Sequence, residues 1–167
     1  MREIFRPGRM WRRRPELRES YDVVIVGGGA HGLATAYYLG QLGVKNVAVL
    51  EQGYIGSGAA GRNTTILRSN YKTPEGARFY DASIRMYEQL SQELNFNLLF
   101  SQCGHLTLAH SDRAMFVMAN RAEVNRLHGI DSQLIDAAEV KKLCPPLNVS
   151  EDVTYPIMGA LYHPPGG

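Results

Sequence analysis

The chain has 167 residues, of which 44% are hydrophobic and 20% are charged, a composition typical of one modest globular domain. No apolar run approaches the roughly 20 residues that span a bilayer, so a transmembrane helix is excluded. The net charge of +2 is uneven, because residues 1–20 hold seven arginines and three glutamates and residues 21–167 therefore carry −2.

The Arg-rich segment 1–20 lacks the apolar core of a signal peptide, and no basic run with interleaved aromatic residues follows it. We therefore interpret it as a surface arm, with contact to a partner subunit as one option, and expect neither nucleic-acid nor membrane binding. Cys103 and Cys144 lack CxxC spacing. They are expected to be reduced, packed thiols, as in a cytoplasmic protein.

Residues 21–51 predict a βαβ unit. A short apolar strand over Val23–Val26 runs into the glycine turn 27–32, GGGAHG, which matches G-x-G-x-x-G. Apolar residues at helical spacing predict a helix from Gly32 to Leu42, and a second apolar strand covers Val47–Leu50. Strand, glycines, helix and strand in this order are typical of a dinucleotide-binding fold.

Each part of this motif has a physical role in holding a dinucleotide. Gly27 permits the tight turn, Gly29 lets a pyrophosphate approach the backbone, and Gly32 lets the helix pack on the strand. Free N–H groups at the helix start and the positive end of its dipole favour an anion. Glu51, nineteen residues after Gly32, stands where a carboxylate accepts bonds from the adenosine ribose.

The glycine motif alone does not separate NAD from FAD. Residues 52–66 are glycine-rich and irregular, and Arg62, Asn63, Thr64 and Thr65 offer a cation and several donors. Such a loop can clamp the cofactor from pyrophosphate toward a flavin. The alternative is an ordinary surface loop in which Arg62 is solvated.

A second helix is predicted to begin at Thr73, with Thr73 as its cap and Pro74 at its first position. Apolar residues at helical spacing form one stripe along it, which we interpret as core. The stripe consists of Tyr80, Ile84, Tyr87, Leu90 and Leu94.

Alternation over Asn97–Leu108 predicts two strands, or one strand with a bulge. A third helix is expected from Ser111 to about His128, and a short helix with a capping box at Asp136 and Glu139 follows it. Residues 154–162 read as a further strand. Only two parallel strands are evident, fewer than a doubly wound sheet needs, so we expect the N-terminal part of a longer polypeptide.

Four runs carry a more specific resemblance: SYDVVIVGGGAHGLATAYYL, GRNTTILRSNY, LLFSQCGHLTLAH and YPIMGALYHPPGG. They resemble the beta subunits of heterotetrameric sarcosine oxidases, a family of amine-oxidising flavoproteins of the D-amino-acid oxidase type. The likeness extends from Ser20 to Gly167, and the segment around Arg62–Tyr71 is its most specific part. The Arg-rich stretch before Leu17 departs from the family.

The resemblance implies an α/β fold: an incomplete Rossmann-like FAD-binding domain of the glutathione-reductase type, with the start of an α+β substrate domain. The expected portions are the arm 1–20, the FAD-binding βαβ portion 21–95 and the beginning of the substrate domain, 96–167. Carried over by position, the residues expected to line FAD are Gly27, Gly29, Ala30, His31, Gly32, Glu51, Arg62, Asn63, Thr64 and Ile66.

The family implies oxidation of sarcosine by hydride transfer to FAD, with electrons passing to FMN at a subunit boundary and then to oxygen. It also implies partner subunits, one of which carries tetrahydrofolate and NAD. The histidine that holds FMN follows later than this chain extends, so His163 is not that residue by position. Catalytic residues are unassigned, and the chain alone is expected to be inactive.

Two other readings remain open. One is a non-catalytic FAD-binding or assembly module, and the other is an oxidoreductase of D-amino acids or tertiary amines. His31 either donates a hydrogen bond to a phosphate or occupies its position because of its size. Arg68 either points toward a flavin or acidic substrate, or pairs with a surface acid. His105, His110 and His128 have no partners at metal or triad spacing.

Overall fold

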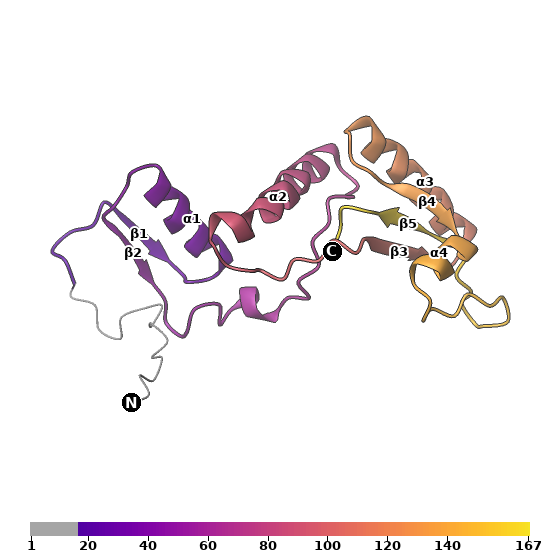
Figure 1. Cartoon of the computed structure of the whole chain (residues 1–167), viewed down its shortest axis with the longest axis horizontal. Coiled ribbons are helices and arrows are strands. Elements are labelled where there is room, and N and C mark those ends of the chain that lie inside the picture. The colour runs from indigo at the N-terminus through magenta and orange to yellow at the C-terminus, as the bar shows by residue number, and fades with distance from the viewer. Residues whose placement is uncertain (1–16) are drawn as a thin grey trace, which may run out of the picture. The chain divides into compact units, whose positions relative to one another are not determined.

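The computed structural model describes residues 17–167, so most of the predicted Arg-rich arm lies outside the described residues. The chain divides into two compact units, one reaching to Thr64 and the other spanning Thr65–Gly167. Figure 1 shows the elements of each unit. The expected boundary near residue 95, between a cofactor portion and a substrate portion, stays a prediction.

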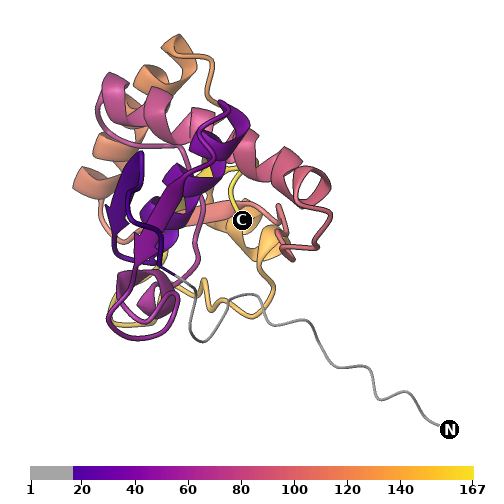
Figure 2. The same ribbon diagram turned by 90° about the vertical axis from the view of Figure 1, so that its left-hand side faces the viewer.

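The first unit contains the predicted βαβ motif. Strands β1 (Val23–Val26) and β2 (Val47–Leu50) pair in parallel, with Val23 opposite Val47. Helix α1 (Ala30–Gln41) connects them and lies along the two-stranded sheet (Figures 1 and 2). Gly43, with φ +91°, follows its end. Both strands are confirmed, and the helix begins two residues earlier than predicted.

The two parallel strands of the first unit keep much of their apolar surface exposed. Val24 is 52% exposed, Val26 85% and Leu50 53%, and no residue of α1 is buried. Parallel strands are normally covered on both faces. The expectation that these strands lack neighbours is therefore confirmed for the part of the chain that the structure describes.

The second unit is built on an antiparallel sheet with the order β3-β5-β4. Its strands are β3 (His105–Ala109), β4 (Gln133–Asp136) and β5 (Gly159–His163). Side chains alternate between the two faces. One face packs on α3 in a cluster with Ala109, Met118, Ala122 and Leu161, and the other forms a second cluster with Ile135, Val140, Ile157 and Ala160.

Three α-helices of the second unit begin with side-chain caps, as predicted. They are α2 (Pro74–Glu93), α3 (Asp112–Leu127) and α4 (Ala137–Leu143). Thr73 accepts a bond from the N–H of Gly76 at 3.2 Å, and Ser111 accepts one from Ala114 at 3.2 Å. At α4 the predicted capping box is present, with Asp136 and Glu139 bonded reciprocally. Each cap satisfies N–H groups that a helix start leaves free.

The prediction that the apolar stripe of α2 is core is wrong for most of its length. Ile84 is 3% exposed, whereas Tyr80 is 40%, Tyr87 37% and Leu94 40% exposed. The reason is that α2 meets only a short part of α3 within the second unit. Tyr80 instead stacks on Tyr71, with ring centroids 4.0 Å apart.

Two predicted strands are shorter than expected. Residues 97–104 form no strand, because Leu99 and Gly104 adopt φ +57° and +85°, which interrupt an extended backbone. The strand expected over 154–162 begins only at Gly159, and β4 was not predicted. Cys103 is exposed, contrary to the packed thiol expected there, while Cys144 is half-buried; both are free. Among the described residues, no helix is long and apolar enough to cross a membrane.

Candidate functional site

The glycine turn between β1 and α1 has a backbone that only glycine accommodates at two positions. Gly27 adopts φ +107°, and its N–H donates to the carbonyl of Leu50 at 2.7 Å, which extends the parallel pairing past β1. At Gly32 a Cβ would overlap the carbonyl oxygen of Gly27 and lie 3.3 Å from Ile25 Cγ2. The first turn of α1 therefore packs directly against the strand exit.

Gly29, by contrast, faces open space. A Cβ there would meet only Ala60 Cβ, at 4.0 Å, which is ordinary van der Waals contact. Gly29 is the N-cap of α1, and neither a side-chain cap bond nor an acid in the first turn serves this helix. The other three α-helices described have side-chain caps. The start of α1 thus presents uncapped N–H groups and a positive dipole end to open space.

Glu51 links the end of β2 to the glycine turn. Its Oε2 accepts from the N–H of Gly28 at 2.7 Å, and its Oε1 accepts from the N–H of Gly53 at 2.8 Å. The bonds from Gly53 and Gly28 lower the pKa of Glu51 below the ordinary glutamate value. The carboxylate is therefore ionised, and the Ser57 hydroxyl and the N–H of Gln52 are further, weaker donors to it.

The loop after β2 is fastened to the same turn. The N–H of Gly56 donates to the carbonyl of Gly28 at 3.0 Å, and a short 3₁₀ helix, η1 (Ala59–Arg62), follows. Asn63 Nδ2 donates to the carbonyl of Ala60 at 2.5 Å, so this side chain holds the end of η1. These bonds keep the loop beside the uncapped start of α1.

The structure brings most of the predicted site residues into one unit. The turn residues lie together, Glu51 is bonded to their backbone, and Arg62, Asn63 and Thr64 lie in the fastened loop. Ile66 belongs to the second unit and is 55% exposed. Thr65, the first residue of the second unit, has φ +55°, a left-handed conformation that is rare for a β-branched residue. Their roles in cofactor binding stay predictions.

Arg68, in the second unit, lies over the ring of Tyr71 with its guanidinium carbon 4.4 Å from the centroid. Its Nη1 donates to Asn70 Oδ1 at 3.1 Å. Within the described residues Arg68 forms no ion pair with a carboxylate, so its pairing with a surface acid is wrong for this structure. A cation–π contact and one amide oxygen orient the guanidinium without neutralising it.

His163 holds the backbone beside Arg68, a role that the sequence reasoning missed. Its Nε2 accepts from the N–H of Ser69 at 3.2 Å, so the ring proton is on Nδ1, which donates to the carbonyl of Asp131 at 2.6 Å. His163 is fully buried, and burial lowers its pKa below the usual histidine range. Leu67 and Gly167 exchange two backbone bonds, at 2.8 and 2.9 Å, which extend this attachment.

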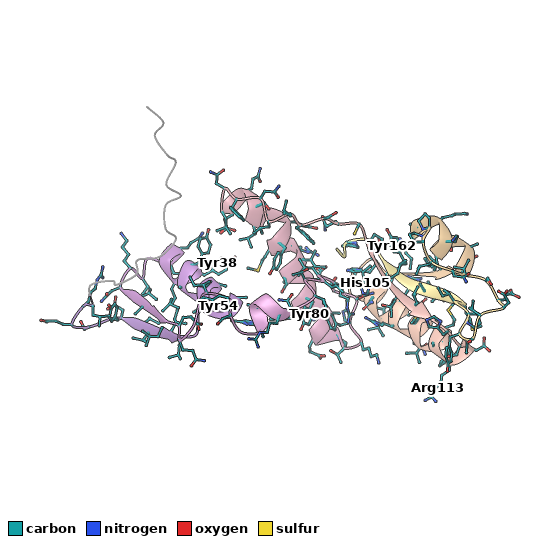
Figure 3. All side chains as sticks on the ribbon, turned by 90° about the horizontal axis from the view of Figure 1, so that it is seen from below. Tyr38, Tyr54, Tyr80, His105, Arg113 and Tyr162 are labelled. Atoms are coloured by element: carbon teal, nitrogen blue, oxygen red, sulfur yellow. The ribbon has the colours of Figure 1, made fainter. Side chains whose placement is uncertain are left out.

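His105, the cross-strand partner of His163, shares this environment, and Figure 3 shows it beside Tyr162. Burial first, and then the positive charge of Arg68, lowers the pKa of His105. Alternation along β3 and β5 could have placed His105 and His163 on one face of the sheet. The contact between His163 and Ser69 could not be predicted in this way, because the two residues are 94 positions apart in sequence. Across the described residues no group of three or more His, Cys, Asp or Glu side chains is arranged to hold a metal ion.

The glycine turn, the acid after β2 and the βαβ topology define a class of dinucleotide-binding enzymes, and comparison with known proteins gives the family. The profile of the family described as FAD dependent oxidoreductase matches residues 22–167. The chain belongs to this family. Its α/β fold class is thereby confirmed, as is the predicted resemblance to the sarcosine oxidase beta subunit.

Three of the curated relatives are named sarcosine oxidase subunit beta. The protein from Arthrobacter sp is 49% identical over 154 residues, and the protein from Rhizobium meliloti is 49% identical over 156 residues. These alignments cover 92% and 93% of this chain but 38% and 37% of the relatives. The chain therefore spans little more than a third of the length of the curated relatives it matches.

Two further matches bear on the fold and on function. The mitochondrial pyruvate dehydrogenase phosphatase regulatory subunit of Mus musculus is 31% identical over 144 residues, which are 86% of this chain and 16% of that protein. Among solved structures, L-proline dehydrogenase from P. horikoshii superposes with a TM-score of 0.82 and 29% identity, covering 90% of this chain and 38% of that one.

Proposed function

We propose that this chain provides the ADP-binding part of an FAD-dependent amine oxidoreductase of the sarcosine oxidase beta-subunit type. The observation that carries the proposal is the start of α1, which has uncapped N–H groups and open space in front of Gly29. This arrangement suits an anion such as a pyrophosphate. Family membership and 49% identity to sarcosine oxidase beta subunits support the choice of FAD.

The residues present fit the cofactor. Gly29, Ala30 and His31 offer backbone N–H groups to the pyrophosphate, and the ionised carboxylate of Glu51 would accept from the adenosine ribose. In this proposal Arg62, Asn63, Thr64 and Ile66 approach the remainder of FAD. FAD, when bound, accepts a hydride from the carbon next to an amine nitrogen. The role of the chain's own residues is to bind and orient the coenzyme.

The proposed substrate is sarcosine, a secondary amine that carries a carboxylate. Arg68 supports this choice, because its oriented guanidinium has no carboxylate partner among the described residues. The names of the relatives support an assembly of several subunits. Passage of electrons to FMN and oxygen in such an assembly is part of the proposal. A cytoplasmic location rests on the two free cysteines.

A second candidate is a non-catalytic module that binds FAD or takes part in assembly. The observation that favours it is the 31% identity to a protein named as a regulatory subunit. An enzyme of related tertiary amines remains a variant of the first proposal, and dimethylglycine dehydrogenase of Rattus norvegicus, at 25% identity, supports that variant. Amine turnover by the complete protein separates the enzyme from the module.

The test of the cofactor site is a titration of FAD with the chain, in which flavin fluorescence reports binding. We expect saturable binding by the natural sequence and its loss in Gly29→Val, because the branched side chain fills the space for the pyrophosphate. Gly40→Ala is the matched control, since a Cβ at Gly40 meets nothing within 4 Å. Equal FAD affinity in Gly29→Val and Gly40→Ala would remove the glycine turn from the site.

A further inference from the structure

The second unit contains a pocket of about 460 Å³ between α3 and the start of α2. Its polar lining consists of Lys72, Thr107, Ser111, Arg113 and Arg121, and no acidic side chain lines it. The volume lies in the range of about 300–1,000 Å³ that is common for small-molecule sites. Three cations around one pocket without an acid leave a local excess of positive charge.

Arg121 is the most buried of these cations. Its Nη2 donates to Asn70, reaching the backbone carbonyl and, at 3.3 Å, Oδ1. Its Nε is buried and has no acceptor, and it forms no ion pair within residues 17–167. Burial, and then repulsion from Arg68, lowers the pKa of Arg121. A half-buried guanidinium that lacks an anionic partner is costly, and an anion would offset that cost.

A second polar group at the pocket also lacks a partner. Thr107 lies at the centre of β3, opposite Leu161 of β5, and its Oγ1 is buried without a hydrogen bond. Most buried polar atoms in proteins are bonded, so Thr107 Oγ1 is a polar atom that β3 leaves unsatisfied. Because this oxygen has almost no accessible surface, an anion in the pocket would accept from the guanidinium of Arg121 and not from Thr107.

The surroundings define the ligand further. Lys72 and Arg113 are exposed, and Figure 3 shows Arg113 extending outward from the beginning of α3, so these two cations stand at the rim. Asp112 lies between the lining residues Ser111 and Arg113 in sequence, but it does not line the pocket. Much of the remaining wall is apolar, formed by Ala114, Val117 and Met118 of α3. A compact apolar group would contact that wall while its charged end meets the cations.

We propose that this pocket binds a small organic anion, a phosphate or carboxylate attached to a compact apolar body. None of its lining residues is among those proposed to hold FAD. Its bound ligand would bond Arg121 at the wall, with Lys72 and Arg113 adding charge at the rim.

The test is a titration of the chain with phenyl phosphate, benzoate, inorganic phosphate and benzyl alcohol, followed by amide NMR shifts on β3 and α3. We expect saturable shifts with at least one aromatic anion, weaker binding of inorganic phosphate and none of benzyl alcohol. Tighter binding of phenyl phosphate assigns the phosphate class, and tighter binding of benzoate assigns the carboxylate class. Absence of saturation with both aromatic anions overturns the proposal.

Variants locate the binding. Arg121→Gln should weaken the preferred anion by about tenfold or more, the usual effect of losing a charge-assisted hydrogen bond. Arg121 also holds Asn70, so Lys72→Gln and Arg113→Gln provide the same test without disturbing that bond. Each should weaken the anion by roughly threefold or more. Arg126→Gln is the matched control, since Arg126 pairs with Glu123 on the same helix at 3.4 Å and does not line the pocket.

Unchanged affinity in both Lys72→Gln and Arg113→Gln, or an equal loss in Arg126→Gln, would overturn the proposal. FAD affinity of all four variants should match that of the natural sequence. A failure of FAD binding in the natural sequence would therefore contradict the proposed function without touching the anion site.

Discussion

Helix α1 of the first unit has no buried residue, whereas α3 and α4 of the second unit contribute Met118, Ala122, Asn125 and Val140 to the interior. The first unit is instead shaped by backbone bonds, such as those between Gly27 and Leu50 and between Gly56 and Gly28. Glycines and one acid therefore specify the conformation of this turn even where little core surrounds it. The second unit depends on packing.

The largest expected effect concerns packing in the second unit. In Gly159→Ala the new Cβ would overlap the carbonyl oxygen of Ile135 and lie 2.8 Å from Met115 Cε, so the centre of the sheet must shift. We expect a loss of roughly 3 kcal/mol in the free energy of unfolding, measured by urea denaturation. Gly129→Ala, where a Cβ meets nothing but φ is +73°, should lose only about 1 kcal/mol.

The same glycine-to-alanine change in the first unit should affect binding rather than unfolding of the second unit. In Gly32→Ala the Cβ overlaps the carbonyl of Gly27, which moves α1 off the turn. FAD affinity should fall by about 100-fold, because the N–H groups proposed to bind the pyrophosphate lose their geometry. Fluorescence titration measures this loss. If the second unit of this variant unfolded at a lower urea concentration, the expectation that the change affects only the first unit would be contradicted.

Glu51→Gln should have a smaller effect. The amide retains one acceptor oxygen, so one of the bonds from Gly28 and Gly53 is lost and the ribose loses a charged acceptor. FAD affinity should fall by about tenfold. In the natural sequence the amide NMR shifts of Gly28 and Gly53 should titrate below the ordinary glutamate pKa, because their bonds lower the pKa of Glu51. Shifts that titrate at the ordinary value would contradict this account.

The smallest expected effect is a dependence of stability on pH that belongs to the second unit. Burial lowers the pKa values of His105 and His163, so the folded state keeps both rings neutral while the unfolded chain takes up protons near pH 6.5. Stability is therefore full above about pH 6.5 and declines as the pH falls below it. Urea denaturation between pH 7 and 5 measures the decline.

His163→Asn should flatten this pH dependence, and His110→Asn, a change at an exposed histidine, should leave it unaltered. If the pH dependence of stability persisted in both His163→Asn and His105→Asn, it would have to come from other titratable groups.

The sequence predicted those parts of the fold that depend on local patterns. β1 and β2 have the predicted bounds, and the caps at Thr73, Ser111 and Asp136 are present, because each reflects a neighbouring backbone requirement. The glycine turn was predictable for the same reason. The exposure of Cys103 was not predictable, because it depends on segments that are distant in sequence.

Long-range contacts account for the other differences. The stripe of α2 has the spacing of a core face, but spacing does not reveal whether a partner covers it. Residues 97–104 alternate like a strand, yet left-handed backbone at Leu99 and Gly104 interrupts them. The buried roles of His163 and Arg121 depend on Ser69 and Asn70, which reach them only through the tertiary fold.

The attachment of Ser69 to His163 has a consequence for the order of folding. The two residues are 94 positions apart. Bringing them together therefore costs chain entropy before the hydrogen bonds between them can form and offset that cost. During synthesis the segment around Arg68 leaves the ribosome early but stays without its anchor until β5 has emerged. The guanidinium proposed to recognise an acidic substrate is therefore set in place late, only after the sheet of the second unit is assembled.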